Sequence, residues 1–106
     1  MDKRQTLTRD EALALVRRYK EIIRPRFDVE PKVIMFGSYS KGHANPDSDI
    51  DVAVIVPESE IIDHWEQSAD LWGDVFKVST LIEPVLMEDN EDSMLYREVM
   101  RTGITV

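Results

Sequence analysis

Three acidic side chains inside otherwise apolar segments are the residues of this chain best suited to chemistry. Asp49 and Asp51 lie at the start of the apolar run 50–56, and Glu83 is the only charged residue in the apolar run 80–87. Successive side chains of a strand alternate between its faces, so Asp49 and Asp51 share one face about 7 Å apart. If the two runs pair at the usual strand spacing of about 4.8 Å, Glu83 can join them.

Three carboxylates this close together predict a bound cation. Without one they would repel one another and raise one another's pKa. Oxygen ligands in small number are what Mg²⁺ accepts when phosphate oxygens and water complete its octahedron. An Asp-x-Asp pair is also common on solvated surfaces, so this half of the site is not specific on its own.

A Gly-Ser pair after the apolar run 33–36 supplies the complementary half. Gly37 lets the backbone approach a ligand closely, and free N–H groups at a helix start attract phosphate. Ser38 can add a hydroxyl donor and cap the short helix that follows, while Lys41 adds a positive charge nearby. Gly-Ser pairs are common turns, but a Gly-Ser pair and two aspartates, eleven residues apart between consecutive apolar runs, are much less expected by accident.

Hydrophobic periodicity predicts the elements that must position these residues. A capping box of Thr8 and Glu11 starts a helix that ends near Arg24, before Pro25. Two further helices are expected from Ser59 to Phe76 and from Asn90 or Asp92 to Gly103, and a short one after Ser38. Strands are expected over 33–36, 50–56 and 80–87, with 104–106 as a short strand or packed on the core. The order predicts one α/β (α+β) domain over residues 1–106, a small mixed β-sheet with helices packed on it.

Two details of this prediction concern packing. In the helix after Ser59, we expect one buried stripe that makes both tryptophans core residues. Its members are Ile61, Trp65, Ala69, Trp72 and Phe76, broadened by Ile62 and Val75. In the last helix we expect Leu95, Val99 and Met100 to pack inward. Residues 1–7 are polar and expected to fray.

Composition limits the partners. The chain has 106 residues, no cysteine and a net charge of −8, a poor match to a phosphate backbone, so nucleic acid is not an expected partner. No run reaches the roughly 18 apolar residues of a membrane span, and no signal peptide opens the chain. We therefore expect a cytoplasmic protein that does not bind membranes. Residues 1–43 carry a net charge of +4 and residues 44–106 one of −12, which either orients a partner or is solvated surface.

The motif itself resembles a known family. Gly37-Ser38, Gly42 and the run 47–51 are similar to the signature of the DNA polymerase beta nucleotidyltransferase superfamily, and the length resembles its minimal nucleotidyltransferases. The resemblance implies the nucleotidyltransferase fold and transfer of a nucleoside monophosphate, by default AMP from ATP, with two Mg²⁺ ions. It implies that Asp49, Asp51 and Glu83 are the catalytic and metal-binding residues, and that Gly37 and Ser38 hold the triphosphate. Tyr39 occupies a position where relatives often carry arginine.

The acceptor is open to three interpretations. Few residues follow the third strand, so the acceptor is expected on a shallow surface or on a second chain, and a homo-oligomer is also possible. Minimal nucleotidyltransferases often pair with a small helical HEPN-domain protein, in toxin–antitoxin systems, and can adenylylate it. The alternatives are a non-catalytic antitoxin that neutralises a helical partner by binding it, and transfer to a small molecule such as an aminoglycoside.

Overall fold

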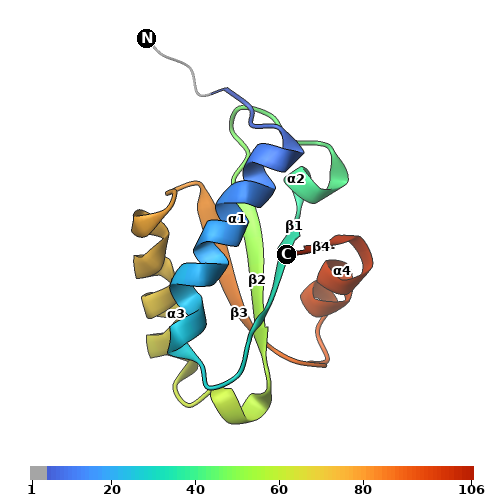
Figure 1. The fold of residues 1–106 in the computed structure, drawn as a ribbon. Coiled ribbons are helices and arrows are strands. Elements are labelled where there is room, and N and C mark those ends of the chain that lie inside the picture. The colour runs from blue at the N-terminus through green and yellow to red at the C-terminus, as the bar shows by residue number, and fades with distance from the viewer. Residues whose placement is uncertain (1–4) are drawn as a thin grey trace.

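The computed structural model describes residues 5–106 and builds a mixed sheet with helices on both of its faces (Figure 1). The α-helices are α1 (Arg9–Ile23), α2 (Ser38–Lys41), α3 (His64–Asp74) and α4 (Met94–Thr102). The strands are β1 (Lys32–Phe36), β2 (Ile50–Val56), β3 (Ile82–Glu88) and β4 (Ile104–Thr105). Short 3₁₀ helices η1 (Arg24–Arg26), η2 (Glu58–Glu60) and η3 (Val75–Lys77) lie between them. The predicted α+β class and element order are confirmed.

The sheet order is β3-β2-β1-β4, with β2 and β3 parallel and the other pairs antiparallel. The mixed sheet predicted from the sequence is therefore confirmed, and residues 104–105 do form a short edge strand against β1. The parallel pairing matters for function. Because β2 and β3 start at the same end of the sheet, Asp51 and Glu83 are Cα partners.

Helices cover the two faces unequally. On one face α1 and α3 pack over the buried side chains of the central strands, with Val16, Tyr19 and Leu71 as contributors from the helices (Figure 1). On the other face α4 covers a smaller cluster with Tyr96 and Val99. No helix in residues 5–106 combines the length and apolar character that crossing a membrane requires.

The first helix begins as predicted. Thr8 Oγ1 accepts a hydrogen bond from the Glu11 backbone N–H, and the Glu11 side chain accepts one from the Thr8 N–H, which forms the capping box. Of residues 1–7, which were expected to fray, residues 1–4 lie outside the described chain. Leu7 is partly buried against the core, and its N–H donates to the Tyr39 hydroxyl over 3.3 Å, so fraying is wrong for this residue.

The prediction for α3 was wrong in two respects. Its N-cap is Asp63 rather than Ser59, and the side chain of Asp63 accepts from the Glu66 N–H. The aromatic part of the stripe expected in the core faces solvent instead: Trp65 is 86% exposed, Trp72 46% and Phe76 78%, whereas Val75 is buried and Ile61 packs against the core as predicted. The buried side chains of this segment are Leu71, Asp74 and Val75.

The last helix also differs in detail. Its N-cap is Ser93, whose Oγ accepts from the Tyr96 N–H, rather than Asn90 or Asp92. Val99 is buried as predicted and Tyr96 joins it, whereas Leu95 and Met100 are exposed. Gly103 follows the helix with an ordinary negative φ, and a Cβ there would collide with the Ile34 side chain. Close packing, not a left-handed turn, therefore explains this glycine.

Candidate active site

The site is built where β1 ends and β2 begins. Gly37 follows β1 with φ 74°, a left-handed conformation that favours glycine. A Cβ at this position would overlap the Asp51 carboxylate, so the missing side chain is also what lets Asp51 lie against the backbone. Gly37, not Ser38, is the N-cap of α2, and Ser38 is its first residue, so the predicted capping role of Ser38 is wrong.

Three carboxylates lie at the same end of the sheet. Asp51 and Glu83 are paired across β2 and β3, as the sequence predicted, and Asp49 immediately precedes β2. Burial raises the pKa of Asp51, and the charge of Asp49 raises it further. Burial also raises the pKa of Glu83, followed by repulsion from Asp49 and Asp51 and a hydrogen bond with Asp49. The three groups therefore interact as the spacing in the sequence predicted.

These carboxylates suit a hard cation only with further ligands. Within residues 5–106, no group of three or more acidic or imidazole side chains makes a complete metal site by itself. Mg²⁺ commonly takes one or two carboxylates and fills its octahedron with substrate phosphates and water. The donor set of Asp49, Asp51 and Glu83 fits that pattern, because all of its donor atoms are oxygens and Asp51 and Glu83 are paired across β2 and β3.

Lys41, predicted to assist phosphate binding, is engaged by the last helix. Its Nζ lies 2.6 Å from Glu98 Oε1, and Glu98 also pairs with Arg101. The two cations lower the pKa of Glu98 to about 2, with Lys41 as the larger cause. Lys41 is thus close to the Gly-Ser turn but has an anionic partner that a phosphate would have to replace.

Glu88 and Asp89 are the other acids at the end of the β3 segment, and His43 and His64 are the two histidines of the chain. Glu88 and Asp89 are at the far end of β3 from Glu83, about 17 Å along the strand. His43 is exposed after α2. His64 Nε2 lies 3.0 Å from the Leu86 carbonyl oxygen, where it covers the edge of β3.

A positioning residue that the sequence did not reveal is Arg9. Its Nη2 donates to the Ser40 carbonyl over 3.1 Å and its Nε to the Tyr39 carbonyl over 3.4 Å. The Tyr39 side chain is buried and accepts from the Leu7 N–H, so it points away from any phosphate at the turn. No spacing in the sequence connects Arg9 with residues 39–40, because the contact joins the first turn of α1 to the distant short helix α2.

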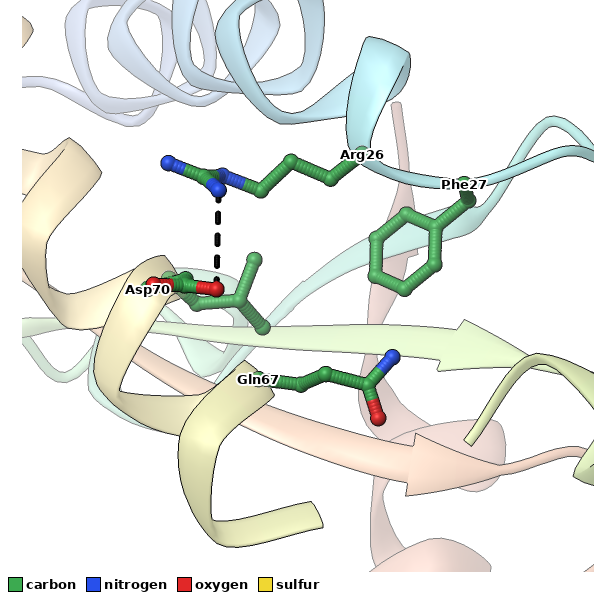
Figure 2. Close-up of a pocket in the computed structure, with 5 residues that line it drawn as sticks. Arg26, Phe27, Gln67 and Asp70 are labelled. Carbon is green, nitrogen blue, oxygen red and sulfur yellow. Dashed lines mark ion pairs between the residues drawn. The ribbon is translucent and has the colours of Figure 1, made fainter. Parts of the chain in front are cut away.

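A second polar cluster joins the end of α1 to α3 and has a structural role. The Arg26 guanidinium donates to both oxygens of the buried Asp74, over 2.6 and 2.9 Å, and lies 3.6 Å from Asp70. The hydrogen bond from Arg26 lowers the pKa of Asp74. Figure 2 shows Arg26 beside Asp70 over a cavity of about 120 Å³ lined also by Phe27 and Gln67. Because two carboxylates already bind its only cation, this cavity is not a candidate anion site.

Comparison with known proteins identifies the relatives of this chain. The profile of a family described as "Nucleotidyltransferase domain" matches residues 16–100. Two proteins of Methanocaldococcus jannaschii are similar and carry the name "Putative protein adenylyltransferase". MJ1379 is 26% identical over 98 residues, covering 84% of this chain and 97% of the relative. MJ0141 is 25% identical over 101 residues, covering 91% and 99%.

The fold has a solved counterpart. A crystal structure from Sulfolobus solfataricus, described as that of a candidate nucleotidyltransferase, superimposes with a TM-score of 0.60. The alignment covers 92% of this chain and 80% of that chain at 18% identity. At this identity the comparison shows the fold alone, and it agrees with the α+β architecture predicted from the sequence.

Proposed function

Because this chain belongs to the nucleotidyltransferase domain family, we propose that it transfers AMP from ATP to a hydroxyl of a partner protein. Residues 1–106 form one catalytic domain in this proposal. The names of the two curated relatives, protein adenylyltransferases in both cases, support AMP as the transferred group and a protein as the acceptor. The family resemblance of the motif supports a small helical HEPN-type protein as that partner.

The observation that carries the proposal is the meeting of three elements at one end of the sheet. Gly37 after β1 makes room for the carboxylate of Asp51 on β2, which is paired with Glu83 on β3. A sheet with only a structural role has no need for acids at these positions, and their mutual repulsion costs stability in the absence of a cation. Such a cost at a conformationally demanding turn is typical of functional sites.

Each residue has a defined role in the proposed reaction. Gly37, Ser38 and Lys41 bind the triphosphate, while Asp49, Asp51 and Glu83 are the oxygen ligands for two Mg²⁺ ions. The acceptor oxygen bonds to the α-phosphorus of ATP as the bond to the pyrophosphate oxygen breaks, so AMP is transferred and pyrophosphate leaves. The hydroxyl proton passes to Glu83 or, where Glu83 is held as a ligand, to solvent. Asp49, Asp51 and Glu83 would hold the Mg²⁺ ions, which would supply neutralisation of the phosphate charge and a lower pKa of the acceptor hydroxyl.

The acceptor class is tested by direct labelling. The protein is incubated with Mg²⁺, ATP labelled on its α-phosphate and the protein encoded by the neighbouring gene. Label on the neighbour supports protein adenylylation, and its loss when Mg²⁺ is omitted supports the metal requirement. Tight binding without label would favour the non-catalytic antitoxin instead.

A further inference from the structure

The outward side of α3 carries an exposed apolar row, which we name the aromatic seam: Trp65, Ala69, Trp72 and Phe76. Trp65, Ala69 and Trp72 lie within about 60° of one another around α3, on a different side from the buried Leu71, and Phe76 continues the row in η3. Three large aromatic side chains in one exposed row are unusual on a soluble surface and mark an interaction site. The active site uses none of them.

The spacing of the aromatic seam matches a second helix. Its residues follow one another at intervals of four, three and four, which is the seam pattern of paired helices. Between the two indoles, Ser68 and Ala69 form a floor of small side chains, and the resulting hollow has a volume of about 390 Å³. A hollow with small residues between two large ones accepts an apolar side chain from a facing helix.

The charges along α3 indicate which charges a partner helix should carry beside its apolar face. Residues 64–74 include no lysine or arginine, and Glu66 and Asp70 follow one side of the aromatic seam. Asp70 has a cation 3.6 Å away in Arg26, and Lys77 of η3 pairs with the buried Asp74 at 3.2 Å, so the exposed charges that α3 itself carries beside the seam are acidic. A second copy packed symmetrically on this face would bring acidic rows together. A helix with basic flanking residues would be attracted.

The aromatic seam and the three carboxylates lie on different sides of the sheet. Asp51 shares its strand face with Ala53 and Ile55, which pack in the cluster covered by α4, whereas Leu71 of α3 packs in the cluster on the other face together with α1 (Figure 1). A partner helix bound along the seam would therefore leave the carboxylates uncovered.

We propose that the aromatic seam of α3 docks an amphipathic helix of a partner protein whose apolar face is flanked by lysine or arginine. This assignment goes beyond the proposed function, because the docking surface and the three carboxylates lie on different sides of the sheet. Docking itself requires no nucleotide and no catalysis.

The test uses a designed probe. A tryptophan-free amphipathic peptide of about three heptads carries leucine at its seam and lysine at its flanks, and a matched peptide carries glutamate at the flanks. Both tryptophans of the chain lie in the seam, so binding is read from a blue shift of their emission. We expect saturable binding of the lysine peptide and affinity lower by about tenfold or more for the glutamate peptide.

Variants locate the binding. Ala69→Glu places a charge in the hollow and should weaken the lysine peptide by about tenfold or more, whereas Ala14→Glu, at an exposed alanine of α1, should not. Asp51→Asn should bind the peptide like the parent, which separates docking from catalysis. Absence of transfer by the parent protein, with intact peptide binding, would contradict the proposed function only.

Four results would overturn the docking proposal: no saturable shift with either peptide, equal affinity for both, an unchanged affinity in Ala69→Glu, or equal weakening by Ala14→Glu. Sedimentation that shows a dimer abolished by Ala69→Glu would assign the seam to a second copy instead. A peptide-independent shift with vesicles of phosphatidylcholine and phosphatidylserine would assign it to a lipid surface.

Discussion

Asp51 and Glu83 are Cα partners across the parallel strands β2 and β3, and their side chains therefore share one face of the sheet. This relationship turns two acids far apart in the sequence into neighbours, with Asp49 beside them. Burial and mutual repulsion both raise the pKa of Glu83.

Gly37→Ala should reduce transfer by about 100-fold or more while the protein stays folded. Alanine is strained at a φ of 74°, and its Cβ would displace the Asp51 carboxylate from its present place. Gly73→Ala is the matched control, because a Cβ at this position in α3 meets nothing within 4 Å. The control should gain up to about 1 kcal/mol of stability and keep its activity. A Gly37→Ala variant as active as the parent would contradict this role.

Glu98 should compete with ATP for the ammonium group of Lys41. Lys41→Ala should lower the affinity for ATP by about tenfold, because one charged contact is lost. Glu98→Gln should raise the affinity for ATP several-fold, since it removes the carboxylate that lies 2.6 Å from Lys41 Nζ. Calorimetric titration measures both, and the double variant should match Lys41→Ala. If Glu98→Gln tightened ATP equally in the absence of Lys41, the competition would not exist.

Asp74→Asn should lower the free energy of unfolding by about 2 kcal/mol without changing the rate of transfer, because Arg26 loses its buried charged partner. Asp70→Asn, at a more exposed contact of the same guanidinium, should cost less than about 1 kcal/mol. Denaturant unfolding of the three proteins gives both values. Equal losses would show that the burial of Asp74 is not what matters.

The contribution of Asp74 should also depend on pH. Its pKa is depressed in the folded state, so the unfolded chain binds the proton first as pH falls from about 5 through the unfolded value near 3.9. The stability difference between the parent and Asp74→Asn should be full above this range and shrink below it. Unfolding curves measured at several pH values check this, and a difference independent of pH would be the contrary result.

The site was largely predictable because its signals are local. Each central strand is predicted by an apolar run in the sequence, and an acidic residue inside such a run is easily identified. Only the parallel register that joins Asp51 to Glu83 had to be assumed, and the structure confirms it. The contact of Arg9 with the carbonyls of residues 39–40 was not predictable, since it depends on how α1 approaches the loop.

The orientation of α3 shows that hydrophobic periodicity alone does not predict which side of a helix is buried. This helix has two apolar sides, and the larger one, with both tryptophans, was predicted to be buried. Tertiary contacts select the other side: the Tyr19 hydroxyl donates to the Leu71 carbonyl over 2.7 Å, and Asp74 is only 2% exposed in its pairing with Arg26. A hydrophobic pattern identifies a stripe but does not say whether the core or a partner covers it.

The central claim is that the paired acids of β2 and β3 carry Mg²⁺-dependent nucleotide transfer. The most direct measurement is the rate at which the α-phosphate label of ATP reaches the neighbouring-gene protein, for the parent, Asp51→Asn and Glu88→Gln. We predict a loss of about 100-fold or more for Asp51→Asn and a parental rate for Glu88→Gln, whose carboxylate lies at the far end of β3. Transfer by Asp51→Asn at the parental rate would contradict the account.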